Sequence, residues 1–270
     1  MKIPLEDNYN DIVGKAQRGL GLTDDQLSKK AGISLSELTQ AKEGQFNEPV
    51  ARKLAAALNL SPNALVESGQ KSWYPEDPGD IPGLACFNTP YDDITVNSYL
   101  VWDPKTSQAV CFDTGATASG MLKFAKEKNL HIQLILLTHT HPDHIADLAA
   151  LKNATGAAAF VCKLEPTNGA ETFDAGKKFT VGNLQIDTHQ TNGHSRGGIT
   201  YVISGLSRPI AIVGDAIFAG SMGGGMVSYQ DALRTNSALM LALLTNTIFC
   251  PGHGPLTTTG EEKKHNPFFP

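Results

Sequence analysis

The sequence predicts a layered, mixed α/β domain preceded by a small all-helical domain. Residues 1–68 contain only short helical patterns separated by glycine-containing turns, whereas short apolar runs rich in Val, Ile and Phe begin near Ile81. From there, strand patterns first follow one another and later alternate with helical patterns. This order is typical of a mixed sheet rather than a wholly parallel one.

The composition is that of an ordinary globular protein. The chain has 270 residues, of which 41% are hydrophobic and 18% charged, enough for one large domain or two smaller ones. The net charge of −5 provides no overall basic field for nucleic acids or anionic membranes. Because no apolar run reaches the roughly 18 to 20 residues that cross a bilayer and the N-terminus lacks a signal-peptide core, we expect a cytoplasmic protein without membrane contact.

The N-terminal part is expected to form about five short helices, each beginning after a polar residue that can cap it. Thr23 and Ser34 are followed three residues later by Gln and Glu, which is the spacing of a capping box. Gly32 and Gly44 end these two helices. Further expected caps are Asn47 and Ser61, the latter followed by proline at the first helical position.

This part resembles the five-helix repressor-type helix-turn-helix domain. The resemblance covers residues 8–68 and implies a helix-turn-helix pair at residues 23–43. DNA binding would require cations on the second helix of the pair, which offers Lys42 against Glu37 and Glu43. The charges therefore favour packing or homo-oligomer formation through these helices over DNA contact.

Two boundaries follow from the composition. The helical domain is assigned to residues 1–68. Residues 69–80, a polar stretch rich in Pro and Gly, are expected to form a linker. The α/β domain then occupies residues 81–270.

The segment LILLTHTHPDHIADL, residues 134–148, concentrates metal-binding residue types at one turn. Its apolar start predicts a buried strand and its end predicts a helix, so the polar residues occupy the strand-to-helix turn. His139 and His141 are two residues apart on extended backbone, so their side chains should point the same way. Asp143 and His144 are adjacent at the helix start and are expected to diverge. Imidazole and carboxylate together suit zinc, iron or manganese.

Three more strand ends each carry one residue of the same kind. His194 lies in a glycine-bounded loop, Asp215 follows an apolar run, and His253 lies between two glycines. Side chains drawn from several strand ends onto one rim are a common way to build a site on rigid supports.

This pattern, H-x-H-x-D-H followed by G-H, G-D and G-H-G, resembles the metallo-β-lactamase superfamily over residues 81–265. The resemblance implies an αβ/βα sandwich with two metal ions at one edge. It assigns the ligands of the first ion to His139, His141 and His194. It assigns those of the second ion to Asp143, His144 and His253. By the same resemblance Asp215 bridges the two ions, and Asp113 orients a ligand histidine.

The implied cofactors are two divalent cations, zinc first, with iron or manganese as alternatives. Such a pair lowers the pKa of water and supplies a hydroxide nucleophile, and the carboxylates of Asp143 and Asp215 are the catalytic candidates. β-Lactamases of this superfamily usually have cysteine where this chain has Asp215, and they do not use an equivalent of His144 as a ligand. The resemblance therefore disfavours β-lactam hydrolysis.

The C-terminal run CPGHGPLTTTGEEKKHNPFFP and the loop GDAIFAGSMGG resemble small glyoxalase II-like hydrolases of the hydroxyacylglutathione hydrolase type. The resemblance implies hydrolysis of a thioester, either S-acyl-glutathione or the ester of another thiol. In this chain the extra helical domain is N-terminal, which leaves the thiol open. Arg196 and Lys263 are candidate contacts for an anionic small-molecule substrate.

Two other functions remain open from the sequence. A persulfide dioxygenase shares the resembled fold and would use a single iron held by His139, His194 and Asp215. A metal- or metabolite-responsive DNA-binding regulator would instead use the helical domain for recognition and the α/β domain for sensing.

Overall fold

The computed structural model describes residues 2–270. Its N-terminal part contains the five expected helices, α1 (Tyr9–Gly19), α2 (Asp24–Ala31), α3 (Leu35–Lys42), α4 (Glu48–Leu58) and α5 (Pro62–Gln70). Both predicted capping boxes are confirmed, because the hydroxyls of Thr23 and Ser34 accept from the backbone N–H three residues on, and their own backbone N–H groups donate to the side chains of Gln26 and Glu37. Ser61 occupies the expected N-cap position of α5, but its side chain makes no capping hydrogen bond.

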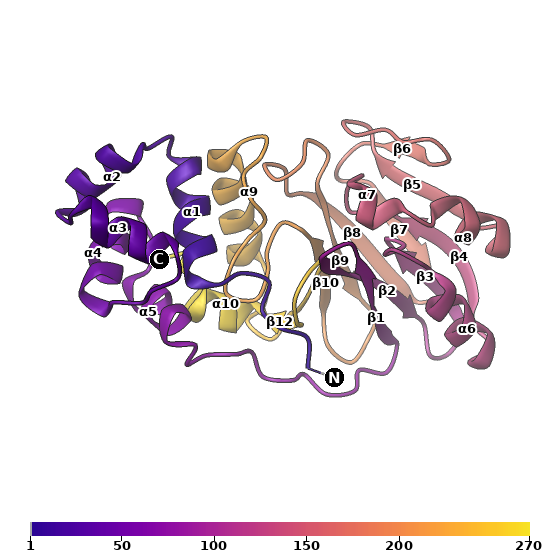
Figure 1. Cartoon of the computed structure of the whole chain (residues 1–270). Helices are drawn as coiled ribbons and strands as arrows, with labels where there is room; N and C mark the ends of the chain where they lie inside the picture. The colour runs from indigo at the N-terminus through magenta and orange to yellow at the C-terminus, as the bar shows by residue number, and fades with distance from the viewer. Residues whose placement is uncertain (1) are drawn as a thin grey trace.

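Two six-stranded sheets form the centre of the α/β part (Figure 1). The first sheet contains, in spatial order, β1 (Leu84–Tyr91), β2 (Ile94–Trp102), β3 (Gln108–Phe112), β4 (His131–Leu136), β5 (Ala158–Cys162) and β6 (Glu171–Phe173). The second contains β12 (Thr257–Thr258), β11 (Ile248–Pro251), β10 (Ile210–Gly214), β9 (Ile199–Ser204), β8 (Leu184–Gln190) and β7 (Lys178–Val181). The pairs β3–β4, β4–β5, β5–β6 and β10–β11 are parallel and the others antiparallel, so the predicted mixed sheet is confirmed.

The sheets face each other across a common apolar core that includes Tyr99 and Phe112 from the first sheet and Ile186 and Tyr201 from the second. The outer face of the first sheet is covered by α6 (Ser119–Glu127) and α8 (Leu148–Thr155), and that of the second sheet by α9 (Tyr229–Ala242). This arrangement is the αβ/βα sandwich, and the expected fold is confirmed. A last helix, α10 (Thr259–His265), follows β12.

The single helix expected after the histidine-rich turn is in fact two, α7 (Pro142–Ile145) and α8. The interruption falls at Asp147. Its backbone N–H donates to the hydroxyl of Thr114, and its carboxylate accepts from the backbone N–H of Ala118. These tertiary hydrogen bonds replace the ones that a continuous helix would form, which the local pattern does not reveal.

The helical part is packed against the sandwich through a shared apolar core. Buried side chains of α1 to α5 form one cluster with Met222, with Tyr229 and Ala232 of α9, and with Phe268 near the C-terminus. Figure 1 shows α9 lying between the helical part and the second sheet. The close fit at α1 is illustrated by Gly19, where an added Cβ would lie 2.2 Å from the ring of Tyr229.

Three further findings bear on the sequence-based expectations. The proposed linker begins later than residue 69, because α5 continues to Gln70. Lys42, the cation of the expected DNA-recognition helix, forms an ion pair with Asp24 at 2.7 Å. DNA binding through this helix stays a prediction that this pairing does not favour. Among residues 2–270, no helix combines the length and the apolar character needed to cross a bilayer.

Candidate metal centre

The structure brings all seven predicted ligand side chains together at one edge of the sandwich. They come from the turn after β4, the loop before β9, the end of β10 and the loop after β11. Their donor atoms form two groups, each lying within 4.8 Å, namely His139, His141, His194 and Asp215, and Asp143, His144 and His253. The grouping matches the two ligand sets that the sequence resemblance implied.

Asp215 lies between the two groups. Its Oδ1 is 3.2 Å from Nε2 of His144, and its Oδ2 is 3.3 Å from Nε2 of His194 and 3.4 Å from Nε2 of His253. His139 contributes a further Nε2 atom at 3.8 Å from Oδ2. One carboxylate therefore faces histidines of both groups, which is the arrangement required of a bridging ligand.

Four of the histidines hold their Nδ1 atom away from the centre in a hydrogen bond. Nδ1 lies 2.8 Å from Asp113 Oδ2 in His144, 3.0 Å from the carbonyl of Gly224 in His194, and 2.8 Å from the carbonyl of Thr95 in His253. In His139, the partner is the Thr138 hydroxyl at 3.0 Å. Since a carbonyl or carboxylate oxygen accepts, Nδ1 of His144, His194 and His253 carries a proton, and Nε2 is the ring nitrogen directed into the centre.

Asp113 is placed to orient His144, as the resemblance implied. Besides the contact with His144, its two carboxylate oxygens accept hydrogen bonds from the backbone N–H and the hydroxyl of Thr138, each at 2.7 Å. Its backbone has a φ of +56°, a left-handed conformation that is uncommon for a residue other than glycine. The surrounding hydrogen bonds maintain this conformation, and strained positions of this kind cluster at functional sites.

The expectation that Asp143 and His144 diverge is wrong. Asp143 Oδ2 lies 3.5 Å from Nε2 of His144 and 3.2 Å from Nε2 of His253. The pair converges because the contact with Asp113 rotates the His144 ring, so that its Nε2 turns back toward Asp143. Adjacent positions on a four-residue helix do not fix the directions of their side chains when a tertiary hydrogen bond intervenes.

Two glycines allow the ligand loops to approach one another. A Cβ added at Gly252 would lie 2.1 Å from Asp215 Oδ1 and 2.6 Å from a ring carbon of His144. A Cβ added at Gly223 would lie 2.0 Å from the carbonyl oxygen of Asp215 and 2.8 Å from Nδ1 of His194. Any larger residue at either position would displace the ligands from their present spacing.

The ionisable donors of the centre shift one another's pKa values. Burial alone would lower the pKa of His144, but Asp215 and Asp113 outweigh it and raise the pKa to about 10. At His253, burial likewise lowers the pKa, but the hydrogen bonds with Asp143 and Asp215 outweigh it and raise the pKa to about 11. Burial, reinforced by His144, holds the pKa of His139 well below its ordinary value. Without a cation the carboxylates retain protons on two histidines, and cation binding would displace them.

The donor set fits a divalent metal pair. Among the donor atoms of this centre, three are buried and have no hydrogen-bond partner within residues 2–270, namely Nε2 of His139, Nε2 of His144 and Oδ1 of Asp215. Such atoms are costly unless a ligand compensates them. Tetrahedral ligands at 2.0–2.1 Å from zinc are roughly 3.3 Å apart. The separations of 3.2 to 3.8 Å around Asp215 are close to that value.

Sequence reasoning missed Glu165, which connects two ligand loops. Its carboxylate accepts hydrogen bonds from the backbone N–H and hydroxyl of Thr140, at 3.0 and 2.8 Å, and from the backbone N–H of Gly197 at 2.8 Å. It thereby fixes the turn of His141 to the loop of His194. Its position after β5 carries no spacing signal, so only the tertiary structure reveals this role.

The candidate substrate contacts receive less support than the ligands. Arg196 is exposed two residues after His194, so it lies beside the centre. Lys263 is exposed on α10, which packs against α5 and β12, and no hydrogen bond or ion pair among the described residues joins it to the seven ligands. His189 is exposed on β8 and belongs to neither group.

Comparisons with known proteins agree with this geometry. The chain is 28% identical over 210 residues to an uncharacterized protein of Mycobacterium tuberculosis, covering 65% of this chain and 93% of that protein. It is 26% identical over 200 residues to the hydroxyacylglutathione hydrolase GloC of Haemophilus influenzae, covering 64% and 92%.

Solved structures show the same likeness. BLEG-1 B3 metallo-beta-lactamase superposes with a TM-score of 0.58 at 27% identity, over 68% of this chain and 99% of that chain. ETHE1 from Myxococcus xanthus superposes with a TM-score of 0.60 at 25% identity, over 68% and 83%. The profile of the metallo-beta-lactamase superfamily matches residues 91–253, more than half of the chain. With its sandwich fold and its paired His/Asp donor groups, the chain belongs to the metallo-beta-lactamase superfamily.

Proposed function

We propose that this chain is a metal-dependent hydrolase of thioesters. The observation that carries the proposal is the position of Asp215, whose two oxygens face donors of both groups. That position supports two cations rather than one. The donors are imidazole and carboxylate without thiolate, so zinc is the cation we propose first, and iron or manganese accept the same set. The likeness to a hydroxyacylglutathione hydrolase supports a thioester as the substrate class.

A divalent pair at this position supplies Lewis acidity and lowers the pKa of water toward neutrality. The chain contributes positioning. Asp113 keeps the His144 ring in place, Glu165 joins two ligand loops, and Gly252 permits their close approach. The hydrogen bond with His253 keeps the pKa of Asp143 below its usual value despite burial, so this carboxylate is ionised at neutral pH and can accept a proton from water.

The reaction adds water across the bond between the acyl carbon and sulfur. The water oxygen bonds to the carbonyl carbon, the carbon–sulfur bond breaks, and its electron pair leaves with the thiolate. One water proton passes, through Asp143 or through bulk solvent, to the departing thiolate, so the products are a carboxylic acid and a thiol. Asp215 would hold the cations.

Two measurements on one preparation test the proposal. Elemental analysis of protein purified without added metal should give two divalent ions per chain, and thioesters of several thiols should be hydrolysed more efficiently than the β-lactam nitrocefin. One iron per chain with oxygen uptake on a persulfide would replace the hydrolase with a dioxygenase. A kcat/KM for nitrocefin above that for every thioester would contradict the substrate class.

A further inference from the structure

The segment before α1 passes directly along the loop that carries His253. A Cβ added at Gly254, the residue after His253, would lie 3.3 Å from the backbone nitrogen of Glu6 and 3.7 Å from its Cβ. The carbonyl oxygen of Pro4 would be 3.6 Å away. Residues 2–8 therefore lie beside the loop that follows His253, and Figure 1 shows the segment before α1 running from the helical part along the sandwich.

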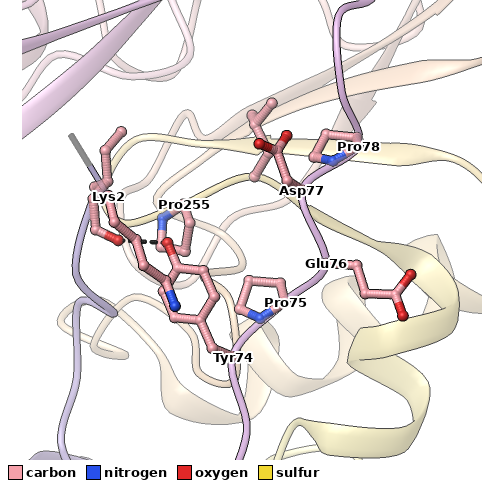
Figure 2. Close-up of a pocket in the computed structure, with 9 residues that line it drawn as sticks. Lys2, Tyr74, Pro75, Glu76, Asp77, Pro78 and Pro255 are labelled. Atoms are coloured by element: carbon pink, nitrogen blue, oxygen red, sulfur yellow. Dashed lines mark hydrogen bonds between the residues drawn. The ribbon is translucent and has the colours of Figure 1, made fainter.

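This segment is anchored on both sides of Glu6. On one side, the hydroxyl of Tyr74 donates to the carbonyl of Ile3 at 2.6 Å, and the ammonium of Lys2 lies 3.3 Å from the centre of the same ring (Figure 2). On the other side, Asp7 accepts hydrogen bonds from Lys15 and from the hydroxyl of Ser221, each at 2.5 Å. With both flanks held, the position of Glu6 is fixed by the fold.

Glu6 differs from its neighbour Asp7 in having no partner of its own. Its side chain is half-buried, and among residues 2–270 it makes neither a hydrogen bond nor an ion pair. The nearby cation Lys15 is already engaged with Asp7 and with the carbonyl of Met222 at 2.9 Å. A half-buried carboxylate without a direct hydrogen-bond or ion-pair partner is unfavourable for folding alone, so a binding role is the better explanation.

The charge of Glu6 is felt at the metal centre. Burial raises the pKa of Glu6, and the charge of His253 is the largest effect opposing that rise. Lys15, which is engaged with Asp7, lowers the pKa of Glu6 to a smaller extent. Its ammonium lies 5.1 Å from the centre of the Phe218 ring, and that ring packs edge-on against His253 at 5.7 Å.

We infer that Glu6 lies beside the substrate site and is a specificity-determining residue, favouring thioesters whose thiol carries a cation and disfavouring those whose thiol carries a carboxylate. This inference rests on the proposed thioesterase function. It also revises the expectation, based on Arg196 and Lys263, of an anionic substrate. The helical part thereby takes part in substrate selection, because the segment before its first helix presents Glu6.

Three acetyl thioesters of similar size test the inference on the metal-loaded, full-length enzyme. Acetylthiocholine is cationic, acetylthiopropionate is anionic, and ethyl thioacetate is neutral and reports general competence. The quantity measured is the ratio of kcat/KM for the cationic ester to that for the anionic ester. We expect Glu6→Gln to lower this ratio about tenfold and Glu6→Lys to lower it further, as charges interacting at close range would.

Glu43→Gln is the matched control, because it removes one exposed carboxylate from the same helical part. It should leave the ratio within twofold of the wild-type value. If both Glu6 variants retain their metal content and their ratios stay within twofold, Glu6 does not face the substrate. An equal fall in the ratio for Glu43→Gln would also overturn the inference, since it would indicate general charge attraction.

A binding measurement separates this inference from the proposed reaction. The methyl thioethers corresponding to the cationic and anionic esters cannot be hydrolysed, and calorimetry gives their dissociation constants. If the wild-type enzyme hydrolyses none of the three esters, the proposed function fails. The preference of Glu6 can still be judged, because tighter binding of the cationic thioether that is lost in Glu6→Gln supports it. Equal binding in both proteins refutes it.

Discussion

Asp113 and His144, which are 31 residues apart in sequence, share a buried contact in which Nδ1 of the histidine lies 2.8 Å from Oδ2 of the aspartate. Both residues are fully or almost fully buried. The same carboxylate binds Thr138, the residue before the first ligand histidine. The Asp113 side chain thus helps to position residues of both donor groups. We expect its loss to weaken metal binding more than it destabilises the fold.

Replacement of this carboxylate is the first prediction. Asp113→Asn keeps the size of the side chain but removes its charge and one acceptor oxygen. We expect metal affinity to fall about 10- to 100-fold, as is usual when a group that orients a ligand is lost. Competition with a chromogenic chelator measures the affinity. An unchanged dissociation constant for both ions would remove the orienting role.

Asp215→Ala should lower the metal content and the turnover more than any other substitution of a single ligand. Its two oxygens face donors of both groups, so we expect both cations to be lost and turnover to become undetectable. Elemental analysis after dialysis provides the measurement. His189→Ala is the control, since that histidine is exposed on β8 and should leave the metal content unchanged. Retention of two ions by Asp215→Ala would contradict the bridging position.

Gly252→Ala tests the close approach of the ligand loops. The added methyl group would overlap Oδ1 of Asp215 and the ring of His144, so metal content should fall even though no donor is removed. Gly120→Ala is a matched control in α6, where the added methyl would meet a ring carbon of Phe87 at an ordinary 3.6 Å. That variant should be neutral or up to about 1 kcal/mol more stable. Full metal content in Gly252→Ala would show that the loops can separate freely.

Glu165→Ala should loosen the contact between the turn of Thr140 and the loop of Gly197. It leaves two backbone N–H groups without their acceptor, which costs about 1–3 kcal/mol of unfolding free energy. Glu165→Gln, which retains one acceptor oxygen, should lose less. Denaturant unfolding of the metal-loaded proteins measures both effects. Equal stability of all three proteins would mean that Glu165 does not join the loops.

The buried carboxylate of Glu262 predicts a pH dependence of stability. Burial, only partly opposed by hydrogen bonds from Thr257, Asn266 and Gly220, raises its pKa from 4.5 to about 8. The folded-state pKa is higher than the unfolded-state pKa. The contribution of protonated Glu262 to the free energy of unfolding is therefore complete below pH 4.5 and is lost as the pH rises through 8. The loss amounts to about 5 kcal/mol at most.

Glu262→Gln keeps the size and loses the ionisation, so its stability should be flat over the same interval. Unfolding of the metal-loaded wild type and variant between pH 5 and 9 makes the comparison. The loaded protein is required because His144 and His253 would otherwise titrate as well. Parallel curves for the two proteins would mean that Glu262 does not titrate in this interval.

Local sequence determined much of this protein. The capping boxes at Thr23 and Ser34 formed as the spacing predicted, since their hydrogen bonds span only three residues. The strands beside the ligands were also readable, because alternating or continuous apolar runs reflect burial directly. Residue types at strand ends singled out the seven donors, and the resemblance to the superfamily implied their division into two ligand sets.

Tertiary structure alone decided the contacts that make these donors a centre. It set the partner of each histidine Nδ1, turned His144 back toward Asp143, ended α7 before Asp147, and placed Glu165 and Glu6 beside ligand loops. These contacts join residues far apart in the chain and leave no local period or spacing. Their energies depend on backbone segments that meet only after the two sheets and the helical part have packed, so local sequence patterns do not reveal them.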